Sequence, residues 1–133
     1  MHGEHAIFSA ADYRQLLDRS AIGIFLSTFE TQGLALAEAW SMDVPTLVWD
    51  PQGLAQWRGR TFESRSSAPY LTPLTGRRWR TIDELEPVLR SAMAERTSFR
   101  PREWVLGNMT DAICSTALLG IIKAGAEHAG IVR

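Results

Sequence analysis

The chain has 133 residues, of which 45% are hydrophobic and 22% charged, with 14 basic and 15 acidic side chains. This balance is typical of one globular domain, and a net charge of -1 gives no general attraction to nucleic acid or anionic membranes. No apolar run reaches the roughly 18 residues of a membrane span, and the N-terminus lacks a signal-peptide pattern. We therefore expect a cytoplasmic protein that does not span a membrane. Cys114 is the single cysteine, which excludes an internal disulfide and a zinc site built of cysteines.

Three short apolar runs predict buried strands: His5–Phe8, Ile22–Ser27 and Pro45–Trp49. The last two are apolar at nearly every position, as in parallel strands that are covered on both faces. The capping-box spacing of Ser9 and Asp12 predicts a helix that ends near Ser20, and Leu34–Met42 predicts a second helix. Strands and helices that alternate with short joints predict an α/β fold, a partial Rossmann-like parallel sheet with flanking helices.

Residues 51–80 mix Gly, Pro, Ser, Thr and Arg without a sustained period. This composition predicts mostly loop, with a short extended piece near Tyr70–Leu71. The segment is locally basic through six arginines, which are Arg58, Arg60, Arg65, Arg77, Arg78 and Arg80. Few aromatic residues stand between them and the whole chain is nearly neutral, so we expect a solvated face and not a nucleic-acid surface.

Two further helices are predicted in the last part of the chain. Thr81 and Glu84 have capping-box spacing, and an apolar stripe follows on a helix that ends near Arg96. Pro101 at a first helical position predicts one long last helix, because a proline there loses no internal hydrogen bond. The apolar face expected for this last helix consists of Val105, Met109, Ile113, Ala117 and Ile121.

Several residue types that often carry chemistry are expected to pack or to stay in solvent here. Cys114 is expected to be a small core residue of the last helix. The five tryptophans are expected to pack, with Trp57 nearest the ligand loop described below: Trp40, Trp49, Trp57, Trp79 and Trp104. His2, His5 and His128 share no face, so we expect no metal site and no cofactor. The domain is expected to span residues 1–124, followed by a frayed tail at 125–133.

The segment from Ser27 to Ala39 carries the clearest chemical pattern. It runs from the end of a predicted buried strand, through a polar turn, into a helix, and open α/β sheets bind their ligands at that edge. The backbone N–H groups of Thr31, Gln32, Gly33 and Leu34 would point out of the helix start, where they can hold a phosphate. Gly33 lets the backbone approach a ligand closely, because it has no Cβ.

Two carboxylates, Glu30 and Glu38, flank this expected anion site. Placed directly against a phosphate they would repel it, but each can accept hydrogen bonds from a pair of neighbouring hydroxyls. A sugar, a diphosphate and a ribose in that order make a nucleotide-sugar. Two other interpretations stay open: Glu38 as a solvated helix residue, and Glu30 as a carboxylate that interacts with the helix dipole.

These residues resemble the Glu-x7-Glu motif of retaining glycosyltransferases of the GT-B fold, the group 1 or family 4 type. The matching positions are Ser27, Glu30, Gly33, Glu38-Ala39, Val44-Pro45 and Asp50. The resemblance implies that Glu30 is catalytic and contacts hydroxyls of the transferred sugar, while Glu38 binds the ribose diol. It also implies that the amides of residues 31–34 hold the diphosphate of a nucleoside-diphosphate sugar and that no metal is needed. Contact of one arginine of residues 51–80 with a donor phosphate stays open as an alternative to the solvated face.

The chain also departs from the family pattern. Thr31-Gln32 stands where Gly-Phe is usual, and Pro51-Gln52-Gly53 stands where a glycine usually follows more closely. The acceptor domain and the basic residues that neutralise the diphosphate in relatives are missing from the sequence. We therefore expect a donor-binding domain that is inactive alone, with an unknown acceptor.

The alternative is a non-catalytic α/β binding or interaction module that kept the fold. Uncovered sheet edges predict self-association, or docking of a missing acceptor domain.

Overall fold

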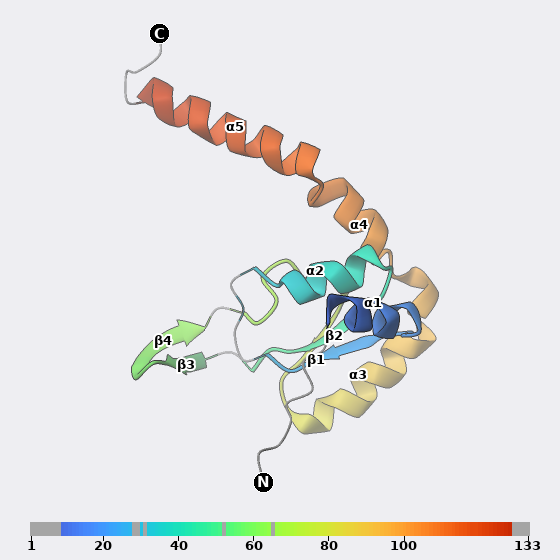
Figure 1. Ribbon diagram of the computed structural model, residues 1–133. Coiled ribbons are helices and arrows are strands. Elements are labelled where there is room, and N and C mark those ends of the chain that lie inside the picture. The colour runs from blue at the N-terminus through green and yellow to red at the C-terminus, as the bar shows by residue number, and fades with distance from the viewer. Residues whose placement is uncertain (1–8, 28–29, 31, 52, 65, 129–133) are drawn as a thin grey trace.

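A three-stranded parallel sheet with helices on its two faces forms the centre of the molecule (Figure 1). The computed structural model describes residues 9–27, 30, 32–51, 53–64 and 66–128. The strand order is β1-β2-β5, with bounds Gly23–Phe25, Thr46–Trp49 and Gly76–Trp79. The helices are α1 (Ala10–Asp18), α2 (Leu34–Ser41), α3 (Ile82–Ala94), α4 (Pro101–Asn108) and α5 (Asp111–His128). The predicted α/β class is confirmed, while the strand predicted at His5–Phe8 lies outside the described residues.

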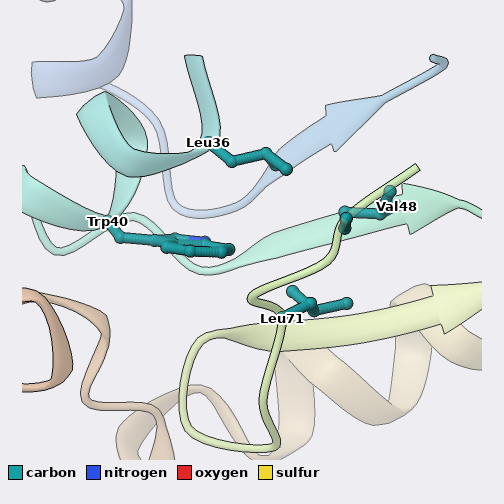
Figure 2. Packing of buried hydrophobic residues seen from close by; sticks show 5 residues of the cluster. Leu36, Trp40, Val48 and Leu71 are labelled. Atoms are coloured by element: carbon teal, nitrogen blue, oxygen red, sulfur yellow. The ribbon is translucent and has the colours of Figure 1, made fainter. Parts of the chain in front are cut away.

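The central strand β2 is covered on both faces, which explains its continuous apolar sequence. Val48 packs against Leu36 and Trp40 of α2 on one face, where Leu71 closes the cluster (Figure 2). Leu47 belongs to the cluster on the other face, which also holds Trp79, Ala92 and Phe99. Consecutive residues of a strand point to opposite faces, so this one strand connects both halves of the core.

The first two helices have the predicted starts. The capping box of α1 forms, because Asp12 N–H donates to Ser9 Oγ at 3.1 Å and Ser9 N–H donates to Asp12 Oδ2 at 3.0 Å. The helix α2 begins at Leu34, directly after Gly33 as its N-cap. These local signals predicted both starts because each is carried by residues within one turn of the helix.

The prediction of mostly loop over residues 51–80 is wrong. Gly53–Trp57 and Arg60–Ser64 form an antiparallel hairpin of β3 and β4, and Gly76–Trp79 forms the edge strand β5. The extended piece expected near Tyr70–Leu71 is absent from a region that the structure describes in full. The hairpin loop is Arg58-Gly59, with φ values of 48° and 74°. Two positive φ values define the loop that Asn-Gly usually occupies, so an arginine there concealed the signal.

The helix α3 starts after Thr81 as predicted, but the predicted capping box of Thr81 and Glu84 does not form. The Thr81 side chain makes no capping hydrogen bond, and the Glu84 carboxylate instead accepts from Arg80 N–H at 2.7 Å. The predicted apolar stripe is also narrower than expected, since Ile82 is 72% exposed and Met93 is 50% exposed. The stripe residues that do contact the core are Leu85, Val88, Leu89 and Ala92.

The predicted long C-terminal helix is confirmed as α5, but the prediction that it runs unbroken from Pro101 is wrong. The helix α4 ends at Asn108, and α5 begins at Asp111 after Thr110, whose backbone oxygen accepts from Cys114 N–H at 2.9 Å. The segments 96–108 and 111–128 meet at 51°. Because α5 turns away at this break, Cys114 is exposed and not a core residue as predicted. The helix continues through His128, beyond the expected end of the domain at residue 124.

The predicted apolar face of the last helix divides at this bend. Val105 and Met109 pack against the core, whereas Ile113 and Ile121 on α5 are 39% and 70% exposed. No single described helix has both the length and the apolar composition of a membrane span. The bent pair formed by residues 96–108 and 111–128 meets those two criteria only when its halves are taken together.

The tryptophans whose side chains are described pack as predicted. Trp40 and Trp104 meet edge to face with ring centroids 5.5 Å apart, and this contact joins α2 to α4. Trp49 and Trp79 stack at 6.2 Å at the ends of β2 and β5. The Trp57 side chain lies outside the described part of the chain, so its place nearest the ligand loop stays a prediction.

Candidate functional site

The turn before α2 lies at the carboxyl edge of the parallel sheet, where the sequence predicts a ligand. Gly33 is buried and has a left-handed conformation, with φ 69° and ψ 44°. A Cβ on this residue would lie 3.3 Å from Leu36 Cδ1 and 3.6 Å from Glu30 Cγ. The Glu30 side chain therefore lies close over the glycine that starts the helix, and the strand, turn and helix order of the prediction is confirmed.

The first amides of α2 are available to a ligand. Ala37 N–H donates to Gly33 O at 3.0 Å, which closes the first turn. Within the described part, the N–H groups of Leu34, Ala35 and Leu36 donate to no acceptor. Gln32 N–H already donates to Glu30 Oε1 at 3.3 Å, and Thr31 lies outside the described residues. Of the predicted phosphate-holding amides, that of Leu34 is free and that of Gln32 is taken by a carboxylate.

Glu38 opens into a cavity of about 360 Å³ between α1, α2 and α4. Tyr13, Arg14 and Arg102 also line this cavity. Arg102 Nη1 donates to the Ser41 carbonyl at 3.1 Å, whereas the Arg14 guanidinium has no hydrogen-bond or ion-pair partner in the described chain. Glu30 is not among the lining residues, so the structure does not bring the two glutamates together in this cavity.

Gln32 and Leu34 border a different cavity, of about 560 Å³. It lies between the start of α2 and the bend of the last two helices, where Tyr70, Trp104 and Cys114 line it. Glu38 thus lines one of these cavities and Gln32 and Leu34 line the other, while Glu30 and Gly33 line neither of the two. Sequence reasoning did not identify Arg14 and Arg102, because these arginines come from α1 and α4 and share no local pattern with the Glu30 to Glu38 segment.

Asp50 follows β2 and holds the loop at the same sheet edge. It is 1% exposed and accepts from Arg78 Nε at 2.9 Å, from Ser67 N–H at 3.0 Å and from Ser66 Oγ at 3.1 Å. Arg78 also donates to the Ala68 carbonyl at 2.9 Å. The acceptor positions of Asp50 are therefore used within the protein, which gives this residue a positioning role at the edge of the site.

Tyr13 lies next to Glu38 and shows the influence of that carboxylate. Its hydroxyl donates to the Ala35 carbonyl at 2.9 Å and so ties α1 to α2. Burial raises the pKa of Tyr13 above its ordinary value, and the charge of Glu38 adds to the rise. The negative charge of Glu38 therefore acts on the Tyr13 hydroxyl, and both residues line the same cavity.

This pKa shift predicts a loss of stability at alkaline pH. The folded-state pKa is the higher one, so the contribution of the Tyr13 hydroxyl is complete below the unfolded-state value of about 10 and is lost as the pH rises through the folded-state value. Tyr13→Phe should remove this part of the alkaline decrease and cost about 1 kcal/mol near pH 7 through the lost hydrogen bond. Urea unfolding at neutral and alkaline pH measures both effects. An equal alkaline decrease in the two proteins would contradict the prediction.

Across the described residues, no three His, Cys, Asp or Glu side chains are grouped so that they could hold a metal ion. Comparison of the chain with protein-family models, with curated proteins and with solved structures found no match.

Proposed function

We propose that the chain is the donor-binding part of a retaining glycosyltransferase of the GT-B type, which holds a nucleoside-diphosphate sugar at the start of α2. The observation that carries this proposal is the left-handed Gly33 cap at the sheet edge, with Glu30 beside it. The first N–H groups of α2 that follow it have no acceptor among the described residues. A helix start of this kind attracts anions through its N–H groups and its dipole. The proposed catalytic Glu30 would contact the transferred sugar next to that anion.

The cavity of Glu38 adds chemical support. A carboxylate accepts hydrogen bonds from a ribose diol, and the guanidinium groups of Arg14 and Arg102 lie on the walls of the same cavity. Arginine pairs well with phosphate oxygens, so the two cations would supply positive charge that the sequence pattern lacks upstream of Glu30. The proposed ligand therefore combines hydroxyls with phosphate, as a nucleoside diphosphate does.

One observation favours the alternative function, a non-catalytic binding module that kept the fold. Glu30 is not among the residues that line the cavity of Glu38, whereas the resemblance implies that both glutamates contact one donor. In that case the Glu38 cavity alone would bind a phosphorylated sugar or nucleotide, and the Glu30 carboxylate would stabilise α2 by its interaction with the helix dipole.

Titration with nucleoside diphosphates and their sugars, followed by NMR, tests the proposal. We expect weak binding, on the order of millimolar or about -4 kcal/mol, because a few amides and diol contacts in an open site compete with water. The shifts should centre on residues 30–38 and disappear in Glu38→Ala. The matched control is Glu86→Ala, since Glu86 is 78% exposed on α3 and forms a surface ion pair with Arg90.

The outcomes distinguish the two functions. Shifts that are the same for nucleoside diphosphates with and without the sugar, and that do not change in Glu30→Gln, would support the non-catalytic module. Shifts outside both cavities would overturn the assignment of the site. We expect no detectable sugar transfer by this chain alone, because transfer also needs an acceptor held against the donor.

A further inference from the structure

The last helix carries exposed apolar side chains that no other described part of the chain covers. Its residues are exposed with the exception of Ala126, and Leu118, Ile121 and Ile122 are 57%, 70% and 56% exposed. Figure 1 shows α5 as it extends away from the sheet beyond α4. Exposed apolar side chains that gather on one element mark a surface for association.

Six residues of α5 have the spacing of a coiled-coil seam. They follow one another at intervals of three and four residues: Asp111, Cys114, Leu118, Ile121, Gly125 and His128. Residues with this spacing lie along one face of a helix. The seam has two large apolar residues at its centre, a small residue on each side of them, and one ionisable group at each end.

We propose that this seam pairs antiparallel with the seam of a second copy of the chain, an interaction that goes beyond the proposed donor binding. In this register Leu118 faces Ile121 of the second copy, and Cys114 faces Gly125 of the second copy. Asp111 then faces His128 of the second copy, and the twofold symmetry repeats the contact at the other end. A parallel pair would place the two Asp111 carboxylates together and lose this complementarity.

The layers also fit each other by size. The two central layers each join a leucine to an isoleucine, which fills the space between the helices as in other coiled coils. In the outer layers a cysteine faces a glycine, so no bulky side chain there holds the two helices further apart than the central layers do. The antiparallel register thus pairs large with large residues and small with small ones along about 27 Å of helix.

The composition of α5 favours a protein partner over a membrane surface. A helix that lies on a membrane usually has a basic face and aromatic anchors. The residues of α5 include one lysine, Lys123, and no Trp, Tyr or Phe. One end of the seam lies beside the rest of the protein, because Cys114 lines the cavity next to Leu34 and Trp104. The helix of a second copy would therefore lie beside that cavity and cover apolar side chains there.

Sedimentation of two matched variants tests the pairing. A single helix pair is a small interface, so we expect a dissociation constant on the order of 10–100 µM. Leu118→Glu should raise this constant at least about tenfold, because it places a carboxylate in the central layers. Leu119 is equally exposed, at 56%, but lies off the seam, so Leu119→Glu should change the constant by less than about threefold. Equal weakening by both variants, or a wild-type monomer at millimolar concentration, would overturn the proposal.

Disulfide formation tests the register and the orientation. Gly125→Cys should give a covalent dimer through Cys114 and the new cysteine, whereas the wild type should not cross-link, because its Cys114 residues lie about 16 Å apart along the axis. Gly120→Cys is the control, since position 120 lies about a third of a turn from the seam. A Cβ at either glycine meets no atom within 4 Å, so neither variant disturbs the monomer.

Two results would overturn the antiparallel pair. Rapid cross-linking of the wild type through Cys114 would indicate a parallel arrangement. Binding of the wild type to vesicles of phosphatidylcholine and phosphatidylserine, with α5 monomeric in solution, would assign the exposed face to a lipid surface. Glu38 lies on α2 and not on the seam, so Glu38→Ala should leave the association of the chain unchanged even where it abolishes nucleotide binding. The two proposals can therefore fail separately.

Discussion

Gly76→Ala is expected to prevent the sheet from forming as it does in the native chain. Gly76 begins β5 and lies opposite Thr46 of β2. A Cβ at this position would overlap the Thr46 carbonyl oxygen, and it would lie 2.9 Å from the carbonyl carbon and 3.0 Å from Leu71 Cδ1. The closest neighbours are backbone atoms of a central strand that is buried on both faces, so they cannot move away without disturbing both parts of the core.

We expect this single methyl group to cost more than about 4 kcal/mol, which is a large part of the stability of a small domain. Urea unfolding followed by circular dichroism would show a chain that is unfolded or strongly shifted in midpoint. Gly107→Ala is the matched control, because a Cβ there meets nothing within 4 Å and lies inside α4. That change should stabilise the helix by about 0.5–1 kcal/mol. Similar midpoints for Gly76→Ala and the wild type would contradict the close contact between β2 and β5.

Asp50→Ala is expected to have the second largest effect. The substitution removes the partner of Arg78 and the acceptor of Ser67 N–H, both at the sheet edge that carries the candidate site. Loss of one partner of a buried ion pair typically costs about 3–5 kcal/mol. The Arg78 side chain is 40% exposed, and water can solvate part of it, so we expect about 2–4 kcal/mol here. The change in the urea midpoint at neutral pH measures this loss.

Two variants separate the charge of Asp50 from its hydrogen bonds. Asp50→Asn keeps an oxygen for Ser67 N–H and should cost less than Asp50→Ala, although it loses the oxygen that accepts from Arg78 Nε and from Ser66 Oγ. Glu86→Ala breaks an ion pair that is 78% exposed on the glutamate side, and such surface pairs contribute about 0–1 kcal/mol. If Asp50→Ala costs no more than Glu86→Ala, the buried network does not hold the loop in place.

The features that sequence reasoning predicted are those whose causes lie close together in the chain. The apolar run at Pro45–Trp49 became the central strand, because a strand covered on both faces must be apolar throughout. The capping box of Ser9 and Asp12 and the Gly33 cap each involve residues only a few positions apart. Both helix starts could therefore be predicted from the local sequence. The turn from Glu30 into α2 could be predicted for the same reason.

Several of the features that it missed depend on residues far apart in the sequence. β5 reads as Gly-Arg-Arg-Trp, and its two arginines find distant partners: Arg78 meets Asp50, 28 residues earlier, and Arg77 meets Glu95, 18 residues later. The Arg14 and Arg102 side chains share the cavity of Glu38 only after α1 and α4 have packed on α2. The bend after Asn108 had a local signal in Thr110 and Asp111, a cap and an acidic first turn, but the continuous apolar spacing across it hid the break.

The β3–β4 hairpin has a consequence for the order in which the chain folds. The parallel strands β2 and β5 pair directly, yet the chain between them must first return from one end of the sheet to the other. Closing a long flexible loop has an entropic cost that grows with its length. The hairpin pairs within itself through a two-residue loop, so it can form early and shorten the flexible part of that loop. A hairpin inserted between two parallel strands can in this way assist the assembly of the central sheet.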